Sequence, residues 1–292
     1  MQYVAAEKLR DPDYLGLHLE AVAAIRALGP QRWYDAHFVR LVNAARHYLG
    51  RVRPDALGTF LDGLDPLRPP ANFREMLVED VFDAETREAV REISRSARLE
   101  QSQLQREENQ NFGRNVVWND PFYLDLQVQL LPRVSDLVGR PLKTSYNFLS
   151  LYGPEGRCEP HLDHPLAMFT FDYCIDQDEV WPIHVSRVVE WPDRAFAHAF
   201  DGDALKADTS LEFATHLLEP GRALIFNGTS QWHYREPKRS GQFCHLLFFH
   251  YYPADCEPLV HPLQWAGHFG IPELEPLCDL YDQILSERAT DT

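Results

Sequence analysis

The first part of the chain carries the hydrophobic pattern of amphipathic helices. From Tyr34 to Leu49, apolar residues recur at steps of three and four, which places them on one face of a helix. Gly50 follows this run, and we predict that the helix ends there. Residues 51–70 are rich in Pro, Gly and Asp, a composition typical of a linker or an irregular wrap-around segment.

Two further helices are predicted before the middle of the chain. Asp83 can cap the first, and the pattern continues toward Leu104. The polar run 105–111 that follows is predicted to be a loop. Residues 122–138 repeat the amphipathic pattern up to Gly139, and Pro132 inside that run predicts a kink or an early break.

The pattern changes at Ser145 from helical spacing to short segments rich in aromatic and β-branched residues. Clusters of Gly, Pro and Asp separate these segments, which cover 146–152, 169–175, 183–189, 212–217, 223–226 and 243–252. Many short strands with such punctuation indicate a sandwich, jelly roll or barrel. We therefore predict an α+β protein whose helical N-terminal half buttresses a C-terminal β-fold.

Composition narrows the possible functions. The 292 residues can bury one large core, or one core with a helical extension. With 28 basic against 44 acidic residues the net charge is −16, which argues against nucleic acid as a partner. No window approaches the roughly 18 consecutive apolar residues of a membrane span, and the N-terminus does not resemble a secretory signal. We expect a cytoplasmic protein with no membrane partner.

The five cysteines do not indicate a disulfide framework or a structural zinc site. Their number is odd, and no CxxC pair is present. We expect free thiols, some of them buried as small apolar side chains.

Two segments carry candidate metal ligands. His161 and Asp163 are two residues apart, so in an extended strand their side chains point to the same face. The second segment has a Pro220–Gly221 turn, a buried strand and then His233. Two histidines and one carboxylate form the facial triad that suits Fe(II) and leaves three coordination positions open.

Together these motifs resemble the prolyl-4-hydroxylase-like branch of the Fe(II)/2-oxoglutarate-dependent dioxygenase superfamily. The tyrosine, glycine-rich and EPHxD run of that family matches Tyr152-Gly153, Gly156, Glu159-Pro160-His161 and Asp163. Its PGxAxxF…H run matches Pro220-Gly221, Ala223, Phe226 and His233, and Pro237 and Gly241 follow as in the family. The similarity spans residues 72–253.

This resemblance implies both a fold and a reaction. The fold is a double-stranded β-helix (jelly roll, cupin-like) at 71–292, after a helical extension at 1–70. Fe(II) is held by His161, Asp163 and His233, and 2-oxoglutarate and O2 are cosubstrates. The implied reaction oxidises an unactivated C–H bond of a small-molecule or amino-acid-like substrate and releases succinate and CO2. Halogenating relatives have a small residue in place of Asp163, so hydroxylation or a related oxidation is expected.

The residue that anchors 2-oxoglutarate departs from the family pattern. Relatives have Lys or Arg on the strand after the distal histidine, whereas ten residues after His233 the chain has Phe243. His245 on the same strand face is one candidate anchor, and Arg239 or Arg187 is another. A protein that does not use 2-oxoglutarate is the third reading.

Other residues near the motifs are assigned more loosely. Tyr152 is expected beside the cosubstrate, because the motif places it there and Cys158 stands where relatives often have tyrosine. Trp181, His184 and Trp232 are expected to line the substrate cavity, although each is also typical of a packed strand residue.

Two other functions stay open from the sequence. A peptidyl Pro, Asp or Asn hydroxylase would carry the same site, with the polar segments near 105–115 and 193–210 as loops around a peptide. A 2-oxoglutarate-independent, cupin-type metal-binding protein would share the barrel, although cupin sites usually present more histidines. The sequence leaves the substrate and the oligomeric state open.

Overall fold

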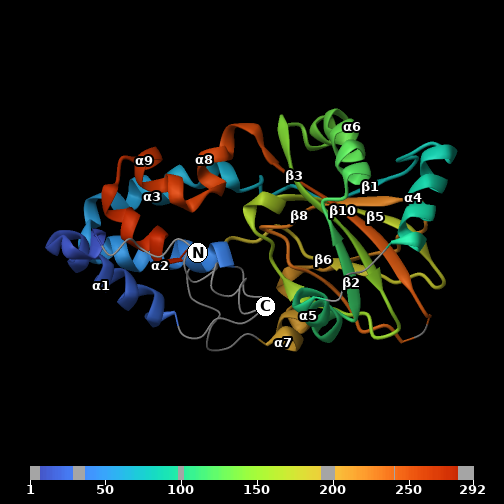
Figure 1. Cartoon of the computed structure of the whole chain (residues 1–292), viewed down its shortest axis with the longest axis horizontal. Helices are drawn as coiled ribbons and strands as arrows, with labels where there is room; N and C mark the ends of the chain where they lie inside the picture. The colour runs from blue at the N-terminus through green and yellow to red at the C-terminus, as the bar shows by residue number, and fades with distance from the viewer. Residues whose placement is uncertain (1–6, 29–36, 98–101, 192–200, 240, 282–292) are drawn as a thin grey trace. The chain divides into compact units, whose positions relative to one another are not determined.

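Helices make up one part of this chain and antiparallel strands dominate the other (Figure 1). The computed structural model describes residues 7–28, 37–97, 102–191, 201–239 and 241–281. Contacts divide the chain into one unit of residues 1–68, 191–200 and 255–292 and another of residues 69–190 and 201–254. Residues 255–281, which the sequence analysis included in its domain of residues 71–292, are grouped with the N-terminal helices.

Aromatic packing explains this grouping. The helices of the first unit are α1 (Pro12–Ala27), α2 (His37–Val52), α3 (Leu57–Gly63), α8 (Glu257–Val260) and α9 (Trp265–Phe269). The fully buried Trp265 lies with its ring centroid 5.2 Å from that of Phe60 and 5.6 Å from that of Phe38. Tyr48 also donates a hydrogen bond to the carbonyl of Glu273 (2.6 Å). The C-terminal segment therefore completes the core of the N-terminal helices.

The α2 helix was predicted correctly in type but not in its end. It continues through Gly50 to Val52 and stops before Pro54. Proline has no amide hydrogen and disfavours helical geometry in the preceding residue, so it ends the helix more firmly than glycine does. The segment 51–70, predicted to be irregular, contains α3 and short 3-10 turns.

The second unit contains two antiparallel sheets. One has the strand order β1-β8-β5-β10-β3-β2, and the other has the order β4-β9-β6-β7. The strands are β1 (Met76–Val78), β2 (Arg114–Trp118), β3 (Leu142–Tyr152), β4 (Cys158–His161), β5 (Phe169–Gln177), β6 (Ile183–Val185), β7 (Ala214–His216), β8 (Ala223–Asn227), β9 (His233–Arg235) and β10 (Cys244–Pro253). Each of the six predicted strand segments overlaps one of these strands, and the predicted α+β class is confirmed.

Both sheets contribute to one buried cluster. Leu224, Phe226, Cys244 and Leu246 come from the six-stranded sheet, and Ile183 and Val185 come from the four-stranded sheet. Along β10 the side chains of Cys244 and Leu246 enter this cluster. Because successive strand residues face opposite sides, the alternate residues, such as His245 and Tyr251, face outward. The hydroxyl of Tyr251 accordingly donates to the carbonyl of Gln127 on α6 (Pro121–Val138).

Helices pack against the strands of this unit: α4 (Ala84–Ser96) contacts β5, α5 (Gln103–Phe112) contacts β2, α6 contacts β3 and α7 (Gly202–Ala207) contacts β4. The predicted N-cap of α4 is confirmed, because the carboxylate of Asp83 accepts the amide of Thr86 (2.8 Å). The α6 helix ends at Gly139 as predicted but continues through Pro132. The apolar side of α6, with Leu130 and Val134 buried, offsets the hydrogen bond that Pro132 cannot make.

The polar run 105–111 was wrongly predicted to be a loop. It lies within α5, which is capped by Ser102 and ends at Gly113 in the left-handed conformation (φ 65°). The side chain of Gln105 exchanges two hydrogen bonds with the backbone of Val116 on β2. The helix is thus held by polar side-chain contacts that the hydrophobic pattern does not record.

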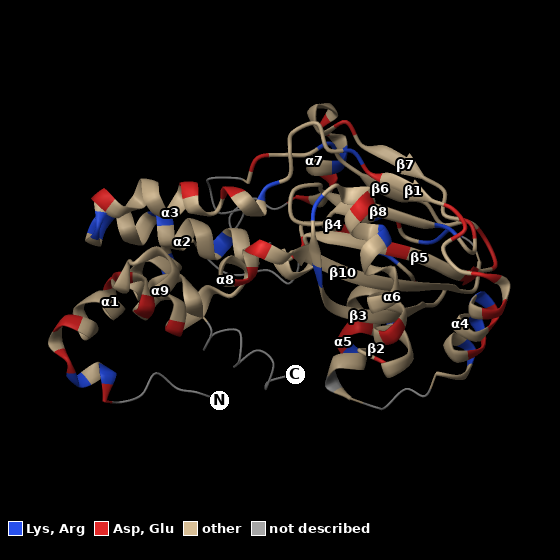
Figure 2. Cartoon of the chain, turned by 90° about the horizontal axis from the view of Figure 1, so that it is seen from above, with Lys and Arg blue, Asp and Glu red and all other residues tan. Residues whose placement is uncertain are grey.

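Acidic and basic residues are mixed along both units rather than separated between them (Figure 2). Among the residues that the structure describes, no helix combines the length and the apolar character needed to cross a membrane.

Removing a buried aromatic ring from the six-stranded sheet should destabilise the protein strongly. Phe171 on β5 is fully buried beside Phe249, so Phe171→Ala should lower the free energy of unfolding by about 3–5 kcal/mol. Leu77 on β1 is 47% exposed, and Leu77→Ala should change the free energy by less than about 0.5 kcal/mol. Urea denaturation measures both; equal losses would contradict this packing.

Candidate metal centre

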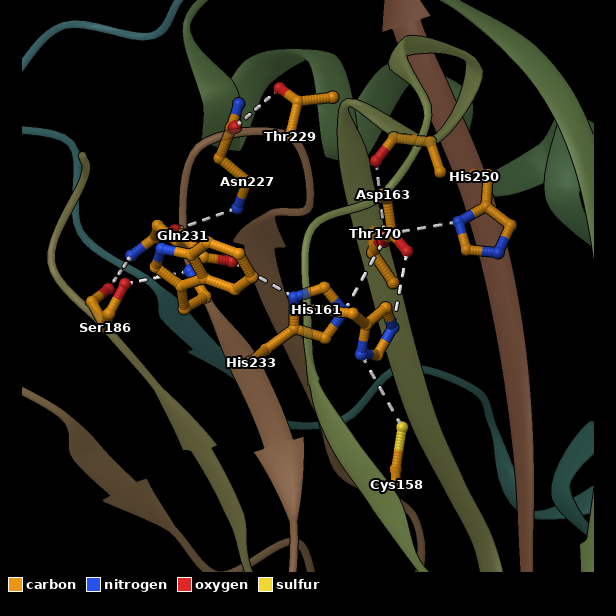
Figure 3. Close-up of polar contacts among 12 residues, drawn as sticks. Cys158, His161, Asp163, Thr170, Ser186, Asn227, Thr229, Gln231, His233 and His250 are labelled. Carbon is orange, nitrogen blue, oxygen red and sulfur yellow. Dashed lines mark hydrogen bonds and ion pairs between the residues drawn. The ribbon is translucent and has the colours of Figure 1, made fainter. Parts of the chain in front are cut away.

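The pairing of β4 with β9 brings the predicted ligands together. His161 lies directly opposite His233 in this pairing, and the two ring centroids are 4.1 Å apart. The carboxylate of Asp163 lies between them, with Oδ1 3.6 Å from Nε2 of His161 and Oδ2 3.6 Å from Nε2 of His233. One potential ligand atom from each residue falls within 4.8 Å of the others. The three side chains point toward one another in Figure 3.

Asp163 reaches this position in a different way from the one predicted. Strand β4 ends at His161, so Asp163 is held by the loop rather than by strand alternation. Its amide donates to the carbonyl of Gly228 (2.7 Å), and its Oδ2 accepts from Thr170 (3.2 Å). A Cβ atom on Gly228 would lie 2.3 Å from this Oδ2, so the position of the carboxylate requires glycine there.

Backbone carbonyls orient the two imidazole rings. Nδ1 of His161 lies 2.9 Å from the carbonyl of Glu159, and Nδ1 of His233 lies 3.0 Å from that of Gln231. A carbonyl oxygen can only accept, so each Nδ1 carries the proton. Each Nε2 therefore presents its lone pair toward Asp163 whenever the ring is neutral.

The electrostatics of the three groups differ. Desolvation and the neighbouring His161 lower the pKa of His233 to about 4. For His161 desolvation acts in the same direction, but Cys158 and Asp163 outweigh it and raise the pKa to about 9. Burial opposes ionisation of Asp163, yet the surrounding histidines hold its pKa below the usual value. At neutral pH the centre thus offers an ionised carboxylate and a neutral His233.

The donor set fits a divalent iron ion. Two imidazole nitrogens and one carboxylate oxygen, converging from one side, are the ligands of mononuclear non-haem iron sites. The His161 and Asp163 side chains are 23% and 19% exposed, so the centre can be reached from solvent, whereas His233 is 7% exposed.

Thr170 links the carboxylate to an aromatic wall. Its hydroxyl lies 3.2 Å both from Asp163 Oδ2 and from Nδ1 of the buried His250 (Figure 3). The wall consists of Trp118, Tyr146, Phe148, Phe248 and His250, with neighbouring ring centroids 4.4–6.4 Å apart. Trp118 at one end of the wall is 41% exposed. This wall is a suitable surface for the apolar part of a ligand beside the metal centre.

Three buried polar atoms facing the space between the sheets have no hydrogen-bond partner among the described residues. They are Ser150 Oγ on β3, Asp172 Oδ1 on β5 and His250 Nε2 on β10. An unpaired buried polar group costs about 1–3 kcal/mol, so such atoms mark positions where a polar ligand can complete the bonding. The Ser150 hydroxyl can donate to such a ligand or accept from it, whereas an ionised Asp172 carboxylate can only accept.

His245, the first candidate for a cosubstrate anchor, is not brought to the metal centre. It faces the helix side of β10, where its Nδ1 lies 3.4 Å from the hydroxyl of Ser94 on α4. Arg239 is exposed and lines a surface pocket of about 310 Å³ with Lys238. The guanidinium of Arg187 donates to the carbonyl of Ser210, and its contacts are on the surface.

Tyr152 and Trp181 do lie inside the unit. The hydroxyl of Tyr152 accepts a hydrogen bond from Arg114 (2.9 Å), and its ring packs edge-on against Trp181 (4.8 Å). The guanidinium of Arg235 also lies against Trp181, 5.2 Å from the centroid of its ring. These residues form a polar and aromatic cluster next to the metal centre.

The remaining predicted substrate residues have other positions. His184 stacks on Tyr234 (4.5 Å) and pairs with the hydroxyl of Thr215 on the outer side of the four-stranded sheet. Trp232 is buried beside His233, and its amide donates to the hydroxyl of Ser186.

The sequence analysis missed three buried residues of this region. Arg235 on β9 donates from Nη2 to Asp172 on β5 (2.6 Å), and Thr170 supports the carboxylate of Asp163. Arg235 stands two residues after His233, so strand alternation would have placed both on one face. The sequence shows no comparable signal for Asp172 or Thr170, because their role depends on which strand lies across from them.

Comparisons with known proteins give likenesses at low identity. No family model matches the chain, and no curated protein matches it in sequence. HygX from Streptomyces hygroscopicus, solved with nickel, 2-oxoglutarate and hygromycin B, matches at 14% identity and a TM-score of 0.48 over 62% of this chain and 83% of that one.

Two other solved structures are similar in the same way. EctD from S. alaskensis with bound Fe matches at 13% identity and TM-score 0.46, over 62% of this chain and 73% of that one. A prolyl-4-hydroxylase from Pseudomonas putida matches at 15% identity and TM-score 0.39, over 65% and 98%. The function proposed below depends on this chain's own residues.

His233 should remain neutral with its proton on Nδ1 well below neutral pH. Its pKa of about 4 and its bond to the carbonyl of Gln231 both favour that form, whereas free imidazole prefers the proton on Nε2. Long-range 15N–1H correlation spectra of the metal-free protein between pH 5 and 8, assigned with His233→Gln, test this. A proton on Nε2, or titration near pH 6.5, would contradict the geometry.

Proposed function

We propose that this chain is an Fe(II)- and 2-oxoglutarate-dependent oxygenase that hydroxylates an unactivated C–H bond of a small-molecule or amino-acid-like substrate. The observation that carries the proposal is the convergence of His161, Asp163 and His233 on one point from two strands and a loop. The reaction class follows from the donor set together with the sequence motifs around it.

The fold proposed for this function is a double-stranded β-helix. The two antiparallel sheets would be its two faces, and the shared apolar cluster between them would be its interior. The helical extension at residues 1–70 is proposed to be separate from the catalytic β-fold, as the sequence analysis expected.

The protein's part in the reaction is to hold and orient. Iron, when bound, would supply the activation of oxygen and of the cosubstrate. The Glu159 and Gln231 carbonyls fix the rings of the two histidine ligands, and Thr170 fixes the carboxylate of Asp163. Such outer partners raise the basicity of ligands and restrict their motion.

The surroundings of the centre offer polar atoms to an organic acid and an aromatic surface to an apolar substrate. Ser150, Asp172 and His250 present unpaired polar atoms between the sheets, where water is largely excluded. The aromatic wall offers a surface on which a carbon framework can lie with one C–H bond near the metal.

Replacing any one of the three proposed ligands should abolish Fe(II) binding while the fold survives. His161→Ala, Asp163→Ala and His233→Ala each remove a donor atom, and two remaining donors hold iron weakly. The measurement is an anaerobic Fe(II) titration followed by 2-oxoglutarate, which should give a visible metal-to-ligand charge-transfer band in the unaltered protein.

His184→Ala is the matched control, because this histidine faces the outer side of the four-stranded sheet and should leave the band unchanged. Full iron stoichiometry in all three ligand variants would reject the proposal. Iron binding without any band would favour the 2-oxoglutarate-independent, cupin-type alternative.

Loss of the Thr170 hydroxyl should weaken metal binding without removing a ligand. Thr170→Val keeps the shape of the side chain but leaves Asp163 Oδ2 without this donor, and loss of such a partner lowers metal affinity about 10- to 100-fold. Thr170→Ser retains the hydroxyl and should bind like the unaltered protein. Competition with a metal-binding dye gives the affinities, and equal values for both variants would remove Thr170 from the site.

A further inference from the structure

We propose that Arg235, held in place by Asp172, anchors the distal carboxylate of a dicarboxylate cosubstrate bound at the metal centre. This inference rests on the proposed function and names the anchoring residue that the sequence left open. It is carried by the position of Arg235 on β9, by its burial and by its unused hydrogen-bond donors.

The anchor cannot come from the interior face of β10. The side chains on that face are Cys244, Leu246, Phe248 and His250, and desolvation lowers the pKa of His250 to about 4, so none is a cation at neutral pH. His245 is on the opposite face beside Ser94. A permanent positive charge has to be supplied by another strand.

Arg235 is suitably placed along β9. It lies two residues beyond His233 on the same strand face, about 6.7 Å away along the strand. In an acid that chelates a metal at His233 through its 2-oxo acid end, three carbon–carbon bonds separate the oxo carbon from the distal carboxylate carbon. The bond to the metal at one end and the hydrogen bond to the guanidinium at the other extend this span to a comparable length. The residue opposite Arg235 is Cys158, whose small side chain occupies little of the space beside the guanidinium.

The guanidinium of Arg235 is buried, oriented and only partly used. Its side chain is 4% exposed, Nη2 donates to Asp172 (2.6 Å), and Nη1 donates to the carbonyl of Trp181. Arginine has five N–H donors, so three are left without an acceptor among the described residues. A carboxylate is the ligand that pairs best with such a planar set of donors.

Asp172 accounts for the burial of this cation. A buried arginine without a counter-charge would be strongly destabilising, whereas a buried ion pair contributes little net stability. Asp172 therefore keeps Arg235 inside and in one orientation. Burial raises the pKa of Asp172, although the charge of Arg235 opposes that shift.

Arg114 is the competing anchor inside this unit. Its Nε donates to the buried Glu108 (2.6 Å), and its Nη1 donates to Tyr152. It lies on the edge strand β2, outside the four-stranded sheet that carries the histidine ligands. Arg235 shares a three-residue strand with His233, which favours it over Arg114.

The test compares two 2-oxo acids by anaerobic titration of the Fe(II)-loaded protein, following the visible charge-transfer band. 2-Oxoglutarate carries the distal carboxylate and 2-oxobutyrate lacks it. Arg235→Gln should weaken 2-oxoglutarate about 10- to 100-fold, the effect of losing hydrogen bonds to a charged group. Its affinities for 2-oxobutyrate and for Fe(II) should equal those of the unaltered protein.

Two variants serve as controls, and a third is expected to strengthen the binding of 2-oxoglutarate. His245→Gln should change neither affinity, and Arg114→Gln should not affect 2-oxoglutarate selectively. Asp172→Asn keeps an acceptor for Arg235 but removes the competing charge, so it should bind 2-oxoglutarate more tightly. If Arg235→Gln does not fold, Arg235→Lys keeps the charge without the planar donor set, and its loss should again be confined to 2-oxoglutarate.

The outcomes separate this inference from the proposed function. A band in the unaltered protein that Arg235→Gln leaves equally tight, or equal losses for both acids, would overturn the assignment of Arg235 alone. A selective loss in Arg114→Gln would move the anchor to that residue. No band with either acid in the unaltered protein would instead count against 2-oxoglutarate as the cosubstrate.

Discussion

The pairing of β4 with β9 is the contact on which the rest of the site depends. Both strands are short, four and three residues, yet their register sets His161 opposite His233 and Cys158 opposite Arg235. Residues 72 positions apart in the sequence thereby meet at one point. A shift of one residue in either strand would turn its polar side chains to the other face of the sheet. The apolar cluster between the sheets holds this register in place.

The interior of the β-rich unit is unusually charged for a space between two sheets. Arg235 pairs there with Asp172, Arg114 pairs with Glu108, and Asp163 lies among histidines. Buried ion pairs are a poor source of stability, since the attraction does little more than offset the lost hydration. Their value lies in geometry, because a charged group with a fixed partner has one orientation before any ligand arrives.

A feature could be predicted from the sequence when it depends on neighbouring residues, and it could not when it depends on strands that are distant in the sequence. Strand alternation and turn residues depend on neighbouring positions, so the strand segments were found from the sequence. His161, Asp163 and His233 were singled out as well, although a loop and not strand alternation holds Asp163 in place. The direction in which β10 turns its side chains depends on its partners β3 and β5, and the sequence alone left His245 as an open candidate. The polar helix α5 was missed because Gln105 binds the backbone of β2 rather than an apolar surface.

The same principle explains why Thr170 and Asp172 were not recognised. Both are ordinary strand residues in the sequence, and their importance arises from the groups that face them from β9 and from the loop at Asp163. Arg235 was within reach of the rule that paired His161 with Asp163. That rule was applied to a His-x-Asp spacing and not to the equivalent His-x-Arg spacing that begins at His233.

The shortness of β9 has a consequence for how this protein can diversify. One three-residue strand carries His233 and Arg235, so their separation is fixed by backbone geometry and not by side-chain conformation. That separation sets the length of any acid that spans the two groups. A change of specificity toward a longer or shorter acid would therefore require substitutions on neighbouring strands, for example at Cys158, because β9 consists only of His233, Arg235 and the residue between them.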